Sequence, residues 1–109
     1  MLRRAFLLRL KDNSLTEYQY HHDQVWPELV AEIEASGIAS ITLFEQEPLI
    51  FLFSEIFDPE AWEKLWCSEV YERWAKLMQP LVFFNEDGTV EMTELKEIWR
   101  VQASAHPDS

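Results

Sequence analysis

The sequence predicts an α+β fold in which a four-stranded antiparallel sheet carries its helices on one face. Strand-like segments lie at residues 3–10, 38–45, 49–57 and 95–101. Helical segments separate the first of these from the second, and the third from the fourth. Hydrophobic residues make up 48% of the 109 residues, so we expect one packed domain.

The first predicted elements are a strand and a helix. Residues 3–10 alternate between two faces, one of which carries Phe6, and this is typical of a half-buried strand. Ser14 and Glu17 have the spacing of a capping box, in which the two side chains satisfy the first backbone N–H groups of a helix. This pattern predicts a helix over residues 15–22.

A second helix is predicted directly after the first. Pro27 lacks a backbone N–H and clashes with a preceding helical turn, so it fits best at the start of a new helix. We therefore expect an irregular turn at residues 23–26 and a helix over residues 27–36. Gly37 is the natural end of that helix.

The middle of the chain predicts a β-hairpin followed by a long helical region. Residues 38–45 and 49–57 are rich in β-branched and aromatic side chains, and three residues join them. Asp58 is expected to cap a helix over residues 59–79, which is interrupted where Ser68 caps its second part.

The C-terminal part carries a weaker pattern. Residues 80–92 contain a turn around a glycine but no clear strand or helix pattern. Alternation over residues 95–101 predicts the last strand. We expect a single domain over residues 1–102 and a flexible polar tail over residues 103–109.

The predicted order of elements, βα(α)ββαβ, is that of the ferredoxin-like split βαβ fold. Several strands carry apolar side chains on both faces, although the helices cover only one face of the sheet. In this architecture a second subunit often covers the bare face, and the two sheets enclose a pocket. We therefore expect a homodimer.

The charge of the chain limits its partners. A formal net charge of −11 repels nucleic acid and anionic membrane surfaces, so neither is expected to bind. A neutral or cationic substrate, or a protein partner, is compatible with this charge. The single Cys67 cannot form an internal disulfide, and the first apolar run is too short for an export signal. No segment is long enough to span a bilayer, and we expect a cytoplasmic protein.

The candidate chemistry lies between Tyr18 and Glu28. Tyr18 and His22 are four residues apart, so they share one face of a helix. A phenol donates or accepts hydrogen bonds, and an imidazole exchanges protons near neutral pH. The alternative is that both side chains pack with their polar tips in water. For Glu28, at the start of a helix, we expect the ordinary role of complementing the helix dipole.

We weigh two further side chains for a functional role, Trp74 and Cys67. Trp74 lies on the last predicted helix, where it either joins the core or offers a flat surface to a sugar. Cys67 has no neighbouring base and is expected to be structural.

The sequence predicts neither a metal nor a cofactor. His21 and His22 are adjacent and point about 100° apart on a helix, and no further ligand set follows at suitable spacing. With only two glycines, the chain has no phosphate-binding loop for a nucleotide.

One string of residues is more specific than any single pair. It reads Tyr18-x-x-x-His22-x-x-x-Trp26-Pro27-Glu28. Weaker motifs follow in a consistent order along nearly the whole chain, to about Val101: Arg3/Arg4-Ala5-Phe6, Gly37, Arg73-Trp74 with Met78, and Glu94-Leu95-x-Glu97-Ile98. Taken together, these motifs resemble the L-rhamnose mutarotase family.

The resemblance implies a dimeric α/β barrel that interconverts the anomers of a six-carbon aldose without a metal or an organic cofactor. By position, His22 matches the proton-transferring histidine of the family, and Tyr18 matches a sugar-binding tyrosine. Trp74 matches the first of two tryptophans that meet the sugar. The second is replaced here by Ala75, and a sugar-contacting tyrosine of the second strand is replaced by Ile41.

Because these two replacements alter predicted sugar contacts, the resemblance specifies the type of reaction more closely than the identity of the sugar. The resemblance implies L-rhamnose, with L-fucose or another 6-deoxy aldose as alternatives. Two other functions fit the same dimeric barrel: a cofactor-free monooxygenase or haem-handling protein, and a sugar-binding protein that has lost its catalytic site.

Overall fold

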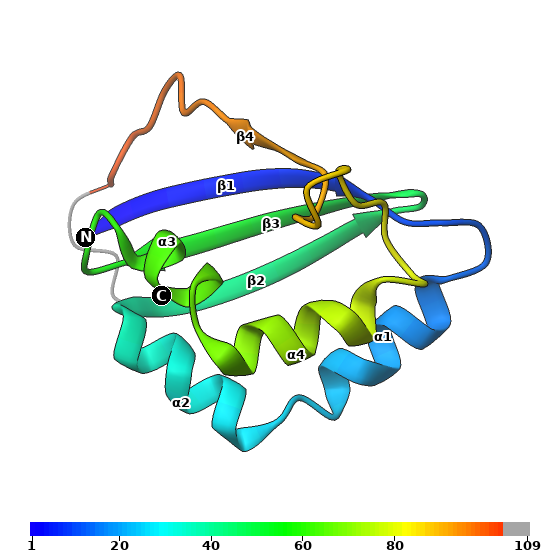
Figure 1. Ribbon diagram of the computed structural model, residues 1–109. Coiled ribbons are helices and arrows are strands. Elements are labelled where there is room, and N and C mark those ends of the chain that lie inside the picture. Colours follow the sequence, from blue (N-terminus) through cyan, green and yellow to red (C-terminus); the bar gives the residue numbers. More distant parts are fainter. Residues whose placement is uncertain (104–109) are drawn as a thin grey trace.

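The computed structural model describes residues 1–103 and has the predicted α+β architecture. The elements, in chain order, are β1 (Leu2–Arg9), α1 (Leu15–Asp23), α2 (Pro27–Ser36), β2 (Ile38–Gln46), β3 (Leu49–Ile56), α3 (Ala61–Trp66), α4 (Glu69–Met78) and β4 (Met92–Leu95). The strands form one antiparallel sheet in the order β2-β3-β1-β4. The helices gather on one face of this sheet (Figure 1). No helix within residues 1–103 is both long and apolar enough to cross a membrane.

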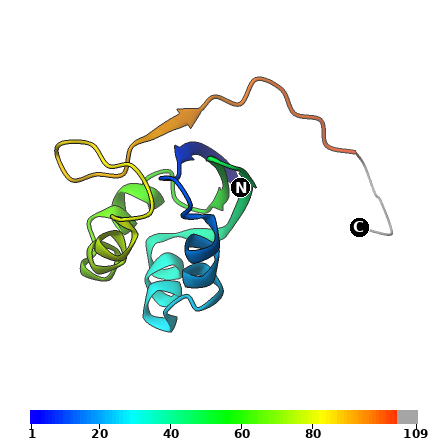
Figure 2. The same ribbon diagram turned by 90° about the vertical axis from the view of Figure 1, so that its right-hand side faces the viewer.

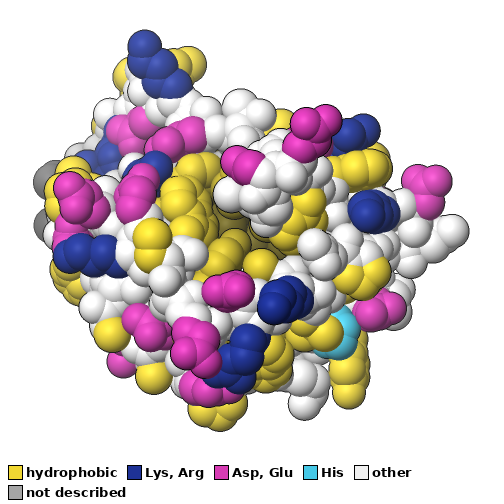
Figure 3. Space-filling model, viewed as in Figure 1, with side chains coloured by type: hydrophobic (Ala, Val, Ile, Leu, Met, Phe, Trp, Pro, Cys, Tyr) yellow, Lys and Arg dark blue, Asp and Glu magenta, His cyan; other side chains and the backbone are white. Residues whose placement is uncertain are grey.

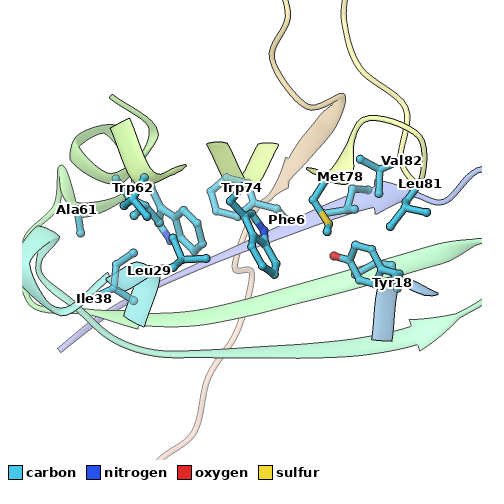
Figure 4. Packing of buried hydrophobic residues seen from close by; sticks show 14 of the residues in the cluster. Phe6, Tyr18, Leu29, Ile38, Ala61, Trp62, Trp74, Met78, Leu81 and Val82 are labelled. Atoms are coloured by element: carbon cyan, nitrogen blue, oxygen red, sulfur yellow. The ribbon is translucent and has the colours of Figure 1, made fainter. Parts of the chain in front are cut away.

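The core lies between the sheet and its helices. Phe6, Leu8 and Leu10 alternate along β1 and its continuation and are at most 6% exposed, as the period of two predicted. On the helical side, Trp74 reaches inward from α4 and Tyr18 from α1 (Figure 4). The most buried face of the sheet is therefore the one on which a cavity can be enclosed.

The end of α2 and the hairpin after it set the position of β2. Gly37 has a φ of +100°, a left-handed conformation that ends the helix, and a Cβ atom there would lie 2.9 Å from the Asp58 Cβ atom. A register shift between Ile38 and Ser40 then turns the strand. As a result Ile41 lies opposite Ser54, on the face toward the helices.

Two helix starts differ from the sequence predictions. Ser14 precedes α1 but caps no backbone N–H, because its hydroxyl points back to the Asp12 carbonyl at 3.4 Å. The helix predicted from residue 59 begins at Ala61, since the Asp58 carboxylate accepts the Glu60 N–H and holds a turn there. The predicted break is confirmed: Ser68 caps α4 by accepting the Tyr71 N–H at 3.2 Å.

The last strand is shorter and earlier than the alternation over residues 95–101 predicted. β4 ends at Leu95, after which the chain leaves the body of the molecule (Figure 2). Trp99 and Val101 are consequently 76% and 69% exposed. Cys67 also differs from its predicted structural role, because it is exposed at the end of α3. The predicted tail lies almost wholly outside the described residues.

The face of the sheet opposite the helices is hydrophobic and uncovered. The cross-strand register aligns Leu7 with Phe51 and Phe51 with Phe44, and it aligns Ala5 with Phe53. Phe44 is 60% exposed, and Phe51 and Phe53 are 37% and 36% exposed. This bare sheet face is a contiguous apolar surface of the kind that marks an interface.

Candidate active site

A cavity of about 530 Å³ lies between the sheet and the helices. This volume is within the usual range of small-molecule sites. On the face shown in Figure 3, mainly hydrophobic side chains surround a hollow near the centre of the molecule. The structure brings all five sequence-predicted site residues to its wall: Tyr18, His22, Ile41, Trp74 and Ala75.

The two polar members come from neighbouring turns of α1. Tyr18 and His22 are four residues apart, and their ring centroids lie 4.4 Å from each other. The His22 Nδ1 atom lies 2.8 Å from the Tyr18 carbonyl oxygen. A carbonyl oxygen only accepts, so Nδ1 must carry the proton and donate it. In the neutral ring, Nε2 is then the nitrogen with a free lone pair.

Burial sets the protonation of this pair. Desolvation lowers the pKa of His22, since the imidazolium is disfavoured away from water. The hydrogen bond to the Tyr18 carbonyl and the charge of Asp23 oppose this effect, while His21 adds to it. Desolvation also raises the pKa of Tyr18, with a smaller contribution from Tyr71. Near neutral pH the site therefore holds a neutral imidazole beside a protonated phenol.

Trp74 is both a core residue and part of the cavity wall. Only 6% of its surface is exposed. Its ring meets His22 edge to face, with centroids 5.2 Å apart at 88°. Trp26 makes a similar contact with Trp74, at 5.2 Å and 89°. The two interpretations of Trp74 are thus compatible, because one indole packs against the core and borders the cavity.

Glu28 does not line the cavity. Its carboxylate accepts two hydrogen bonds from the Arg73 guanidinium, at 3.1 and 3.0 Å, and this lowers the pKa of the Glu28 carboxyl. Arg73 also lies over the Trp26 ring at 5.7 Å. Glu28 is therefore tied to α4 through Arg73, next to the aromatic stack, and its role exceeds that of a helix-dipole charge.

The two adjacent histidines face different partners. The His21 Nε2 atom lies 3.3 Å from a Glu17 carboxylate oxygen, one turn earlier on α1. His22 faces the cavity instead. Within residues 1–103, no three side chains of metal-ligating type gather at one point.

Tyr71 is a cavity residue that was not among the predicted site residues. This side chain on α4 borders the cavity, three residues before Trp74 and four before Ala75. That helical spacing was the available signal. Val90 and Met92 also border the cavity, although they belong to a segment that has no clear sequence pattern.

Comparisons with known proteins identify relatives of this chain. The family model described as L-rhamnose mutarotase matches residues 3–101. The L-rhamnose mutarotase of Bacillus subtilis is 34% identical over 101 residues, which cover 91% of this chain and 97% of that protein. That of Oceanobacillus iheyensis is 30% identical over 103 residues, which cover 93% and 99%.

A solved structure has the same fold. The crystal structure of an L-rhamnose mutarotase from Formosa agariphila has a TM-score of 0.82 and 24% sequence identity to this chain. The match covers 94% of this chain and 100% of that one. The predicted resemblance is confirmed, and the chain belongs to the L-rhamnose mutarotase family.

Proposed function

We propose that the protein is an isomerase that interconverts the α and β anomers of L-rhamnose or a related 6-deoxy aldose. The observation that carries this proposal is the setting of His22. One ring nitrogen is bound to the Tyr18 carbonyl at 2.8 Å, and the side chain borders a cavity large enough for a hexose. The names of the relatives, which share 30% and 34% identity with this chain, support the same reaction and sugar.

The reaction needs one proton to move between two oxygens on the same carbon. Nε2 of neutral His22 accepts the proton of the anomeric hydroxyl, and the bond from the anomeric carbon to the ring oxygen breaks. The electron pair goes to the ring oxygen, which takes the proton from the imidazolium. The open aldehyde rotates, and the reverse steps close the ring on its other face. No redox change occurs, so acid/base chemistry suffices without a metal or an organic cofactor.

The remaining predicted residues would hold the sugar. Tyr18 keeps its proton because burial raises its pKa, so its hydroxyl can donate to the sugar. Trp74 presents an indole beside His22 for the apolar face of the ring. Ile41 and Ala75 add apolar wall, which suits the methyl group of a 6-deoxy sugar better than a hydroxyl.

The first prediction tests His22 directly. His22→Ala should fold and should exchange L-rhamnose anomers about 10²- to 10⁴-fold more slowly than the unmodified protein, the usual contribution of a positioned acid or base. The measurement is NMR saturation transfer between the two anomers. His21→Ala is the matched control, since its ring faces Glu17 on the same helix and should be dispensable.

The same assay decides between the alternatives. Unchanged exchange in His22→Ala would remove this residue from the mechanism. A panel of L-rhamnose, L-fucose and L-mannose identifies the preferred aldose, and a 6-deoxy sugar should be fastest. Sugar binding without exchange in the unmodified protein would instead support a binding protein that has lost its catalytic site.

We further infer that two copies pair through the bare sheet face. Its central phenylalanines, Phe44, Phe51 and Phe53, remain 36–60% exposed in one chain. A contiguous apolar surface of this kind is unfavourable in water unless it is covered. A dimeric ferredoxin-like protein from an uncultured marine organism has the same fold, with a TM-score of 0.57 and 16% identity. The pairing would complete a dimeric α/β barrel.

A further inference from the structure

Tyr71 lies in the cavity but has no part in the mechanism described so far. It belongs to the first turn of α4, where the Ser68 cap accepts its backbone N–H at 3.2 Å. Its side chain borders the same cavity as Tyr18 and His22 and packs against the buried core. Tyr71 is therefore held at its backbone by the cap, and its side chain borders the space proposed for the substrate.

Burial sets the protonation state of Tyr71. Burial raises the pKa of Tyr71 to about 12, so it keeps its proton over the working range of the protein. Tyr71 also makes a small contribution to the raised pKa of Tyr18, and both side chains line the same cavity. The Trp66 N–H lowers the pKa of Tyr71, yet it is buried without a hydrogen-bond partner of standard geometry within residues 1–103. The cavity wall that Tyr18 lines therefore also carries the protonated side chain of Tyr71.

Three polar groups at the cavity already have partners within the protein. The Ser40 hydroxyl donates to Glu55 at 3.3 Å, and the Trp62 N–H donates to Ser54 at 2.9 Å. His22 uses Nδ1 for the Tyr18 carbonyl. A hexose has several hydroxyl groups, and each one that loses water without gaining a partner weakens binding. The apolar residues of the wall cannot supply such partners.

We propose that Tyr71 is a further substrate-binding residue, whose hydroxyl donates a hydrogen bond to one hydroxyl group of the bound sugar. It stands on α4 one turn before Ala75 and thus supplies a polar contact in a wall where Ala75 and Ile41 have none. Because burial keeps the Tyr71 hydroxyl protonated, this hydroxyl can donate its proton in a hydrogen bond to the sugar. The identity of the ligand as a sugar rests on the proposed function.

The test compares Tyr71→Phe with the unmodified protein. The change keeps the ring and removes one hydroxyl, so it should raise KM for L-rhamnose roughly threefold to tenfold, the usual effect of one lost hydrogen bond. Because the contact is to a non-reacting hydroxyl, kcat should change less than KM. The matched control is Tyr20→Phe, on α1, where the ring is 60% exposed and packs against His21. Its KM should be unchanged.

A set of monodeoxy L-rhamnose analogues separates sugar contact from packing. For the analogue that lacks the contacted hydroxyl, Tyr71→Phe and the unmodified protein should have the same KM. Equal KM values for L-rhamnose itself would overturn the inference. So would a KM that rises equally for every analogue together with a fall in Tm, because that result assigns Tyr71 to packing.

The proposed function and this inference fail in different ways. If the unmodified protein exchanges no aldose, the proposed function is wrong, and the inference is judged by the Kd of L-rhamnose measured by NMR titration. A Kd that is weaker in Tyr71→Phe by the same factor would still support the contact. An equal Kd in both proteins, or no binding to the unmodified protein, would overturn it.

Discussion

At the scale of single residues, the two nitrogens of His22 have different tasks. Nδ1 bonds to the Tyr18 carbonyl at 2.8 Å, which fixes the tautomer and the orientation of the ring. Nε2 is left for the substrate. The helix that carries His22 therefore also supplies the carbonyl that orients its ring.

The lowered pKa of His22 predicts a pH profile. In the proposed mechanism the free enzyme needs neutral His22, so kcat/KM should fall only when pH drops through the folded pKa, which lies below the ordinary 6.5. We expect kcat/KM to reach half its maximum at a pH below 6.5 and to stay constant up to about pH 8. Above that pH, other groups are free to titrate. An inflection at or above pH 6.5 would contradict the assignment. The residual rate of His22→Ala should lack this inflection.

The same shift affects stability in a defined direction. Below about pH 6.5 the unfolded chain binds a proton at His22 that the folded chain resists, so the free energy of unfolding falls as pH decreases. The loss begins at the unfolded pKa and ends at the lower, folded pKa. Acidic conditions therefore weaken the site and the fold together.

At the scale of elements, the break between α3 and α4 determines where the α4 residues point. Ser68 accepts the Tyr71 N–H at 3.2 Å and donates to the Leu65 carbonyl at 2.7 Å. The helix that starts there directs Trp74 and Ala75 at the cavity. A helix that ran through this point unbroken would rotate these side chains relative to the sheet.

Ser68 and Ser14 both precede a helix, but only the Ser68 side chain caps a backbone N–H. Ser68→Ala should lower the free energy of unfolding by about 1 kcal/mol, since it removes a working N-cap. Ser14→Ala should cost less than about 0.5 kcal/mol, because Ser14 caps no N–H and its one contact, to the Asp12 carbonyl, is 3.4 Å long. Urea denaturation of both variants measures the difference. The reverse ranking would show that the capping box predicted at Ser14 forms in solution.

At the scale of the whole molecule, the sheet has one face for chemistry and one for association. The helices cover one face (Figure 1), and residues of the sheet and the helices line the cavity between them. The other face carries the exposed phenylalanines of β2 and β3. Since the two faces are separated by the sheet, pairing through the bare face leaves the cavity of each copy in place.

The dimer proposal predicts the effect of a charge on the bare sheet face. Phe53→Glu should yield a folded monomer, because burial of an unpaired carboxylate in the interface costs several kcal/mol. Light scattering coupled to size-exclusion chromatography measures the mass. Tyr20→Glu is the control, since Tyr20 is exposed on α1 in the opposite layer, and it should remain a dimer. A protein that is monomeric before any change would refute the proposal.

Much of this molecule was determined by local sequence. The alternation along β1, the helix start at Pro27, the αL end at Gly37 and the cap at Ser68 each depend on neighbouring residues, and the structure contains all of them. For the same reason the pairing of Tyr18 with His22 was predictable, because four residues make one helical turn.

Tertiary structure alone decided the shape of the cavity. Val90 and Met92 close one side, from a segment without sequence periodicity that pairs with a strand distant along the chain. Tyr71 shares a helical face with Trp74 and Ala75, but only the packing of α4 against the sheet shows that this face borders the cavity. Alternation continues past Leu95, but β4 ends there, since a strand needs a partner as well as a pattern. Cavities and strand pairings join residues far apart in sequence, so no local pattern specifies them.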